Sequence, residues 1–197
     1  MKRQMFTLLA CAAATVLLSA CGTSSSPPTT NAPSPSPSVT AHEAKAGEPP
    51  LIHVDGYQYV DPTSAQLKTA SLQNLTSITK VFPEAFTAVS VHLVSGPGMG
   101  TTWIVEMQLS PTLASPDMKQ SMLTGMAAEG MTRADPPMKL VTESGETVAV
   151  GTTHYYKTKV APVWVWIHGD VLTMLLSISG DGAPTYVSAY LATANST

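Results

Sequence analysis

Two apolar segments joined by a two-residue turn constrain the fold more than any other part of the sequence. Residues 163–168 and 171–179 are rich in β-branched and aromatic side chains, and Gly169-Asp170 between them suits a tight hairpin turn. A turn of this length fixes the register of the two strands. The expected cross-strand pairs are His168 with Val171, Trp166 with Thr173, and Trp164 with Leu175.

This register sorts the side chains of the hairpin onto two faces, both largely apolar. The aliphatic face, expected to be the core face, carries Val163, Val165, Ile167, Leu172, Met174 and Leu176. The opposite face carries Trp164, Trp166 and His168, with Tyr155 or Tyr156 nearby on the preceding strand. Such an aromatic platform can stack a sugar ring, a peptidoglycan fragment or an acyl chain. Alternatively, a helix or the segment around Leu51 to Val60 covers these rings as a second core.

Further helices and strands alternate in blocks along the chain. Alternating hydrophobicity predicts strands over 87–95, 103–109, 138–142 and 147–159. Helical spacing and capping residues predict helices over 62–82 and 116–130, and a final one from 182 through 191. Blocks of this kind favour an α+β fold, an antiparallel sheet of about five to six strands with about three helices packed on one of its faces.

The segment over residues 22–50 is unsuited to that fold. It is rich in Ser, Pro, Thr and Ala and nearly free of large apolar side chains, so it buries too little surface to offset the entropy of ordering. We therefore expect residues 21–50 to form a disordered tether. Residues 51–197 have the length of a single globular domain with its own core.

The residues before the tether have the pattern of a secretory signal. Lys2 and Arg3 precede about fourteen mostly apolar residues, fewer than the roughly twenty that a membrane-spanning helix needs. The junction Leu18-Ser19-Ala20-Cys21 resembles the lipobox of bacterial lipoproteins. This resemblance covers residues 1–21 only, and it implies that residues 1–20 are removed and that Cys21 becomes the lipid-modified amino terminus. The alternative is ordinary secretion after Ala20, with a free thiol at Cys21.

The acidic balance of the chain excludes some classes of partner. Loss of Lys2 and Arg3 leaves eight of the ten Lys and Arg residues against thirteen Asp and Glu, a formal charge of −5. An excess of acid without runs argues against binding nucleic acid or the headgroups of anionic lipids. Membrane association is therefore expected to depend on the acyl chains at Cys21, on the extracytoplasmic side of the cell membrane.

Motifs for catalysis or metal binding are missing from the sequence. It contains neither Gly-x-Ser-x-Gly nor His-Glu-x-x-His, and its five histidines lack ligand spacing, so we expect no catalytic set, no metal site and no cofactor. Met118, Met122 and Met126 recur at helical spacing. Such a stripe can bind Cu(I) outside the cytoplasm, but it is also what an ordinary core stripe shows.

These observations favour a non-catalytic envelope lipoprotein. Its domain would bind a partner protein or an amphiphilic or cell-wall ligand, and the candidate residues are Trp164, Trp166, His168 and Tyr156. One alternative is a copper-binding lipoprotein that uses the methionines. The other is a cell-wall-directed enzyme that uses scattered carboxylates such as Glu106 and Asp170, which requires two carboxyl groups about 5–10 Å apart in a cleft.

Overall fold

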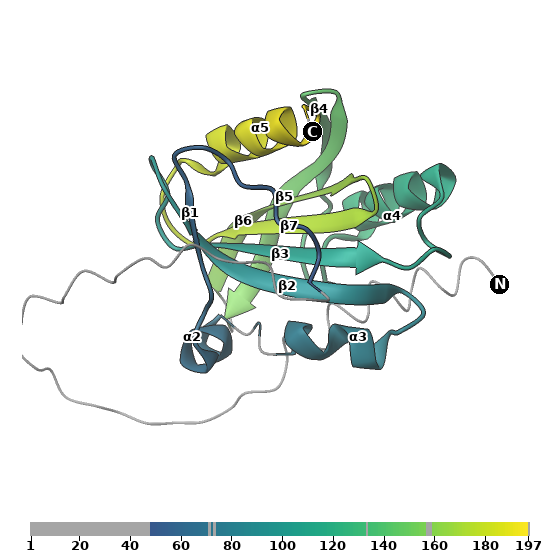
Figure 1. Ribbon diagram of the computed structural model, residues 1–197, viewed down its shortest axis with the longest axis horizontal. Helices are drawn as coiled ribbons and strands as arrows, with labels where there is room; N and C mark the ends of the chain where they lie inside the picture. The colour runs from purple at the N-terminus through teal and green to yellow at the C-terminus, as the bar shows by residue number, and fades with distance from the viewer. Residues whose placement is uncertain (1–47, 71, 73, 133, 157–158, 197) are drawn as a thin grey trace, which may run out of the picture.

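The computed structural model describes residues 48–70, 72, 74–132, 134–156 and 159–196, without the side chains of residues 76 and 156 (Figure 1). The predicted signal region, the lipobox-like junction with Cys21 and the predicted tether up to residue 47 lie outside the described residues. The expected domain from residue 51 onward lies almost entirely within them.

In the described part of the chain, seven antiparallel strands form one sheet in the order β1-β2-β3-β7-β6-β5-β4. The strands are β1 (Gln58–Val60), β2 (Phe86–Ser95), β3 (Thr102–Leu109), β4 (Lys139–Glu143), β5 (Glu146–Tyr156), β6 (Lys159–His168) and β7 (Val171–Ser177). The predicted α+β class and antiparallel sheet are confirmed, but the strand count is higher than predicted. The strand that the sequence did not indicate is β1, whose three residues are too few to show an alternating pattern.

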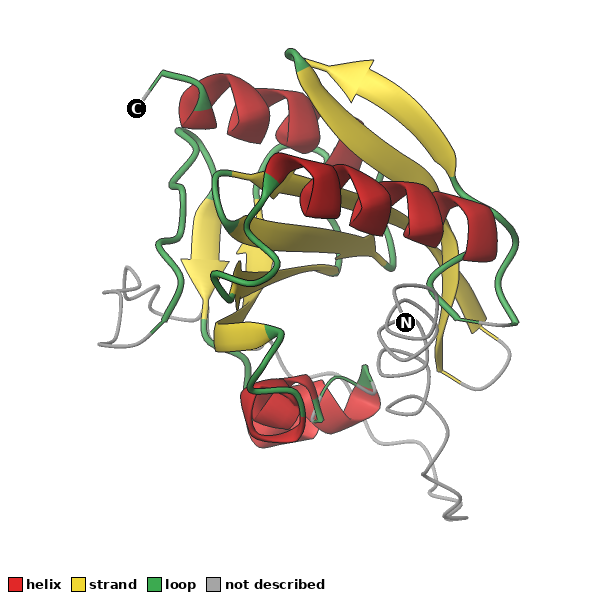
Figure 2. Cartoon of the chain, turned by 90° about the vertical axis from the view of Figure 1, so that its right-hand side faces the viewer, coloured by secondary structure: helices red, strands yellow, loops and turns green. Residues whose placement is uncertain are grey.

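Helices cover both faces of the sheet. On one face lie α2 (Ser64–Thr69), the 3₁₀ turn η1 (Leu75–Ser77), α3 (Ile78–Val81) and α4 (Pro116–Glu129), and on the other lies α5 (Ala183–Ala194). Figure 1 shows α5 above the sheet and α2 and α3 below it, and Figure 2 shows α4 lying across the sheet. The prediction that all helices pack on one face is wrong, because the second face of β6 and β7 is also apolar and needs a cover.

The helix predicted over residues 62–82 is three short elements instead. Thr63 caps α2, since its Oγ1 accepts the N–H of Gln66 at 3.3 Å and its own N–H donates to Gln66 Oε1 at 2.8 Å. Thr69 Oγ1 then donates to the carbonyl oxygen of Ala65 at 2.9 Å, where α2 ends. Ser, Thr and Asn side chains compete for backbone groups in this way, and they recur between α2 and α3.

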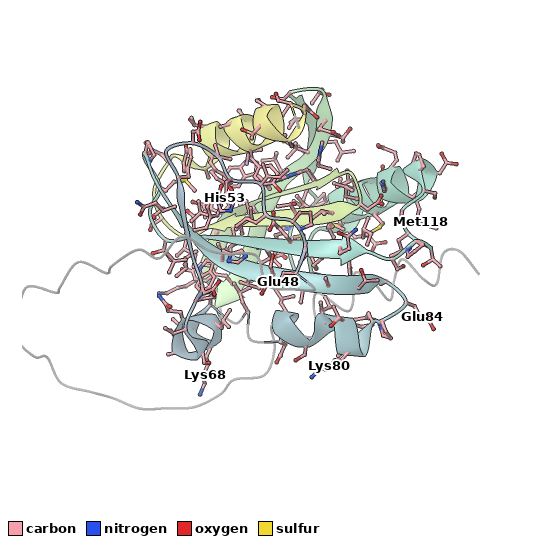
Figure 3. The ribbon with its side chains drawn as sticks, viewed as in Figure 1. Glu48, His53, Lys68, Lys80, Glu84 and Met118 are labelled. Atoms are coloured by element: carbon pink, nitrogen blue, oxygen red, sulfur yellow. The ribbon has the colours of Figure 1, made fainter. Side chains whose placement is uncertain are left out.

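Lys68 and Lys80 point away from the sheet on this side (Figure 3).

Two hydrophobic cores lie on opposite sides of the sheet. The first, beneath α2 to α4, contains the predicted aliphatic set Val163, Val165, Ile167, Leu172, Met174 and Leu176. The second lies beneath α5 and the segment over residues 51–59, and its members include Val54, Tyr59, Ile104, Trp166, Leu175 and Tyr186. The predicted register of the β6–β7 hairpin is confirmed at all three pairs. The two faces of this hairpin therefore separate the two cores.

The amino-terminal end of α5 is fixed by the close approach of two glycine-rich turns. Met99 of the β2–β3 turn forms an isolated bridge with Gly180, which has a φ of 87°. A Cβ atom at Gly180 would lie 2.5 Å from the carbonyl oxygen of Gly98, so no larger residue fits without movement. The N–H groups of Asp181 and Gly182 both donate to that same oxygen, at 3.1 and 3.0 Å.

Candidate functional site

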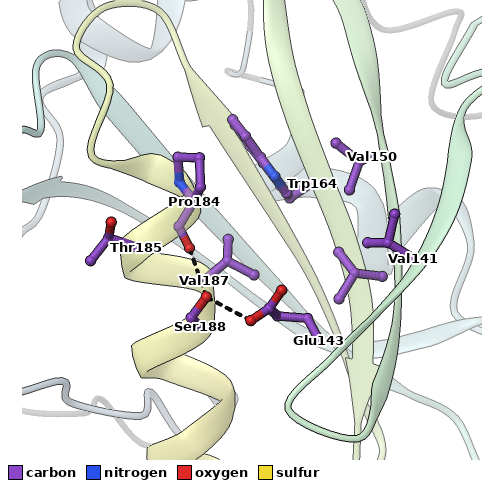
Figure 4. Close-up of a pocket in the computed structure, with 9 residues that line it drawn as sticks. Val141, Glu143, Val150, Trp164, Pro184, Thr185, Val187 and Ser188 are labelled. Atoms are coloured by element: carbon purple, nitrogen blue, oxygen red, sulfur yellow. Dashed lines mark hydrogen bonds between the residues drawn. The ribbon is translucent and has the colours of Figure 1, made fainter.

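A hollow of about 220 Å³ lies between α5 and strands β4, β5 and β6 (Figure 4). The three strands form its floor, because Val141 of β4 pairs with Val148 of β5, and Val150 of β5 pairs with Trp164 of β6. The apolar lining residues are Val141, Val148, Val150, Trp164, Pro184 and Val187, and the polar ones are Glu143, Thr185 and Ser188. The hollow is therefore an apolar recess with one carboxyl group at its edge.

Two hydrogen bonds hold the β4–β5 turn against α5 and so fix the walls of the hollow. Ser188 Oγ donates to Glu143 Oε1 at 2.7 Å and also lies 3.1 Å from the carbonyl oxygen of Pro184 (Figure 4). Asn195 Nδ2 donates to the carbonyl oxygen of Ser144 at 2.8 Å. These contacts join residues at least 45 positions apart in the chain, so no local sequence pattern could have indicated them.

The two predicted tryptophans occupy different environments. Trp164 is partly buried and lines the hollow, whereas Trp166 is 0% exposed. The ring of Trp166 packs edge-on against Tyr190 of α5, with the ring centroids 5.1 Å apart. Of the two interpretations of this face, an open platform and a covered second core, Trp166 fits the covered one, because it belongs to the second core. For Trp164, a role in binding stays a prediction.

The other predicted site residues lie apart from the hollow or outside the described atoms. His168 ends β6, and its Nδ1 lies 3.2 Å from Glu146 Oε1, with both side chains about one-third exposed. It is not among the residues that line the hollow. Tyr156 ends β5 opposite Lys159, but its side chain lies outside the described ones, as does Cys21. Of the predicted residues with a described side chain, Trp164 alone lines the hollow.

A buried carboxyl group lies at the centre of the second core. Glu106 of β3 is 0% exposed, and it accepts hydrogen bonds from Tyr190 Oη at 2.9 Å and from Ser90 Oγ at 3.2 Å. Burial raises the pKa of Glu106 to about 7, although the two hydrogen bonds oppose this rise. In the sequence, Glu106 shares its face of β3 with Thr102 and Gln108, which is typical of a solvent-facing side, so no local signal marked its burial.

Further polar contacts in the second core join α5 to the amino-terminal segment. The hydroxyl groups of Tyr59 and Tyr186 lie 3.0 Å apart, and the N–H of Val54 donates to Tyr59 Oη at 3.2 Å. Burial raises the pKa of Tyr186 well above its ordinary value, so this hydroxyl keeps its proton. Beside this cluster, His92 is 2% exposed, and its Nδ1 lies 3.3 Å from Asp61 Oδ1. These contacts hold a closed interior together.

Glu106 and Asp170, the carboxylates named for the enzyme alternative, do not share an open cleft. Glu106 is fully buried beneath α5. Asp170 lies in the exposed β6–β7 turn, where its Oδ1 accepts a hydrogen bond of 2.7 Å from Lys119 Nζ. The geometry of this pair therefore gives the enzyme alternative no support.

A second buried carboxylate forms hydrogen bonds with the part of β5 that β4 does not reach. Asp135 accepts hydrogen bonds from Thr153 Oγ1 at 2.8 Å and from the N–H of His154 at 3.0 Å, and His154 Nδ1 lies 2.7 Å from the same carboxylate. Burial by itself would raise the pKa of Asp135, but these hydrogen bonds outweigh it and hold the pKa below its ordinary value. Since β4 pairs with β5 only as far as Val150, Asp135 supplies an acceptor where β4 is absent.

The methionines on α4 pack in the first core. Met122 is 2% exposed, and Met118 and Met126 are partly buried against the same cluster (Figure 3 labels Met118). The stripe thus packs as a core stripe does. Among the described residues, no group of three or more His, Cys, Asp or Glu side chains is arranged to hold a metal ion.

Comparisons with known proteins found no relative of this chain. No family model matches it, and neither a curated protein nor a solved structure matches it. Within the described ranges, no helix is both long enough and apolar enough to cross a membrane.

Proposed function

We propose that this chain is a cell-envelope lipoprotein, anchored through lipid on Cys21, whose domain binds the apolar part of an amphiphilic ligand in the hollow beside Trp164. The signal pattern, the lipobox resemblance and the Ser/Pro-rich tether support the location. The observation that carries the binding proposal is the hollow itself, an apolar recess lined by a predicted site residue.

The size of the hollow limits what can enter it. Sites that enclose a whole drug-sized ligand occupy about 300–1,000 Å³, and this hollow of about 220 Å³ is smaller. It suits a short alkyl chain or a single large apolar group, with the remainder of the ligand outside. Each methylene that enters contributes about 0.8 kcal/mol, so a chain of several carbons supplies measurable affinity.

Glu143 sets a preference among headgroups. Its carboxylate lies at the edge of the hollow and is held there by Ser188. An ammonium group or a hydroxyl group on the ligand can interact favourably with this carboxylate, whereas an anionic headgroup is repelled. For ligands with the same alkyl chain, we therefore expect affinity to fall from ammonium to neutral to carboxylate.

The test is a titration of the purified full chain with three eight-carbon probes: octylammonium, octyl glucoside and octanoate, each below its micellar concentration. Octylammonium should change the tryptophan fluorescence saturably. Trp164→Ala lacks the indole that reports binding, so isothermal titration calorimetry measures its affinity for octylammonium, which should be at least about tenfold weaker, equivalent to about 1.4 kcal/mol. Glu143→Gln should bring the affinities of the charged probes closer together.

The matched control is Val160→Ala, at a 49% exposed apolar residue on the same strand as Trp164 but outside the hollow. This variant should bind octylammonium as the unsubstituted chain does. Equal binding by the Trp164→Ala variant, or a signal that never saturates, would remove the basis of the proposal.

A further inference from the structure

Strand β4 forms an open edge of the sheet. Among the residues that the structure describes, it is the last strand in the sheet order and pairs only with β5. Its first four residues are exposed, and Leu140 and Val141 are 41% and 40% exposed although both are large and apolar. An exposed edge of this kind is a template for pairing with another strand. The other edge strand, β1, has only three residues.

The β4–β5 turn determines which backbone groups of β4 face outward. Ser144 and Gly145 have φ values of 49° and 85°, as in a two-residue type I′ turn. In such a hairpin the flanking residues, here Glu143 and Glu146, form a hydrogen-bonded pair, and hydrogen-bonded pairs alternate from there. The backbone N–H and C=O groups of Val141 and Lys139 therefore form hydrogen bonds with β5. Leu140 and Thr142 direct their N–H and C=O groups toward the open edge.

We infer that β4 pairs antiparallel with β4 of a second copy of this chain, around a two-fold axis at Val141. In this register Leu140 of each copy lies opposite Thr142 of the other, and the outward backbone groups of both residues are satisfied. Val141 lies opposite itself in a non-hydrogen-bonded pair, where side chains approach most closely. The two sheets then become one continuous sheet.

The charges on β4 argue for a second copy as the occupant of this edge. Lys139 begins the strand and Glu143 ends it. In the antiparallel register centred on Val141, Lys139 of each copy lies opposite Glu143 of the other, so the opposite charges pair at both ends. A shift in register or a parallel arrangement loses these pairs. A lysine on an edge strand usually discourages pairing with another strand. Because Glu143 of a second copy can neutralise Lys139, β4 pairs better with another β4 than with an arbitrary apolar strand.

The interface would be small. A five-residue edge buries less than the roughly 1,600 Å² of a standard protein–protein interface, so the association is expected to be reversible and concentration-dependent. Val141 also lines the hollow beside Trp164. The two hollows would therefore lie on the same face of the joined sheet, one on each side of the axis. This inference stands independently of the ligand proposed for the hollow.

Cysteine cross-linking of the full chain tests the register. Val141→Cys should form a disulfide-linked dimer, because the two Cβ atoms of this pair lie only about 4.5–5.5 Å apart. Lys139 is also exposed, but in this register it lies opposite Glu143 of the other copy, so Lys139→Cys by itself should link far more slowly. Co-expression of the Lys139→Cys and Glu143→Cys chains should restore the link. The unsubstituted chain, examined in parallel, shows any background from Cys11 or Cys21.

Charge reversal tests the same contacts without a cysteine. Lys139→Glu alone and Glu143→Lys alone each place like charges opposite one another at both ends, and each should weaken self-association about tenfold or more. An equal mixture of the two variants should recover the dimer, which also shows that both variants are folded. Sedimentation velocity over a range of concentrations measures the association.

Three results would overturn the inference. The first is a chain that stays monomeric at every concentration, with no preference for linkage at Val141. The second is equal linkage from Val141→Cys and Lys139→Cys, which indicates random collision. The third is linkage of Val141→Cys to a different protein, which would make the edge a site for another partner's strand.

Discussion

The hydroxyl of Tyr190 donates a 2.9 Å hydrogen bond to the carboxyl group of Glu106, which joins α5 to the centre of the sheet. Both side chains are almost completely buried. Because α5 forms one wall of the hollow beside Trp164, this bond links the shape of the candidate site to the protonation of one buried acid. The stability of the domain should therefore depend on pH in a way that this residue controls.

Glu106→Gln should remove a decline in stability between about pH 4.5 and 7. Burial raises the pKa of Glu106 from its ordinary value of 4.5 to about 7. In that window the unfolded chain releases a proton that the folded chain keeps, so the free energy of unfolding falls as pH rises. The whole loss is about 3 kcal/mol. Urea unfolding at pH 4.5 and at pH 7.5 measures it, and an unchanged difference in the variant would contradict this account.

Trp164→Ala and Trp166→Ala should differ in their cost to stability. Trp166 is completely buried against Tyr190, so its removal should lower the free energy of unfolding by about 3–5 kcal/mol. Trp164 is only partly buried at the wall of the hollow, so its removal should cost less than half as much. Urea denaturation compares the two variants. Equal losses would show that Trp164 is an ordinary core residue.

Gly180→Ala should destabilise the junction that fixes the start of α5. Gly180 has a φ of 87° and lies against the β2–β3 turn, so a methyl group meets both backbone strain and a steric clash. Gly56 is the matched control, since its φ is 83° with no atom within 4 Å of an added Cβ. Gly56→Ala should show the backbone strain alone, at about 1 kcal/mol. A thermal unfolding midpoint no lower for Gly180→Ala than for Gly56→Ala would refute the role of the close approach.

The β6–β7 hairpin shows what the sequence could predict. Gly169-Asp170 fixed the length of the turn, and turn length determines register, so three cross-strand pairs and the aliphatic core face followed directly. The helix over 116–130 was equally accessible, because Pro116 and Gly130 mark its ends. These features depend on residues close together in the chain.

Other features depend on contacts between distant segments. Trp164 and Trp166 share a face of β6, and only the position of α5 leaves one at the hollow and buries the other. Likewise, Glu143 and Ser188 form the polar edge of the candidate site across 45 positions. The apolar second face did indicate a cover, but no local pattern identified α5 as that cover. The break between α2 and α3 was missed because hydrophobic spacing outweighed the polar residues between them.

Material from the native host should carry lipid at position 21. The lipobox resemblance predicts that Leu18-Ser19-Ala20 is removed with the signal and that the mature chain begins with a diacylglyceryl-modified Cys21. Intact-mass spectrometry of the membrane fraction would show the added mass. Cys21→Ala should abolish the modification and leave the signal attached. An unmodified thiol at a processed amino terminus would instead support ordinary secretion.

The most direct test of the proposed function is ¹⁹F NMR of the full chain labelled with 5-fluorotryptophan and titrated with octylammonium. Among Trp103, Trp164 and Trp166, only Trp164 lines the hollow, while the other two are buried in separate cores. We expect the Trp164 resonance to shift saturably while those of Trp103 and Trp166 stay in place. A Trp164 resonance that does not respond, or three resonances that shift together, would contradict the proposed function.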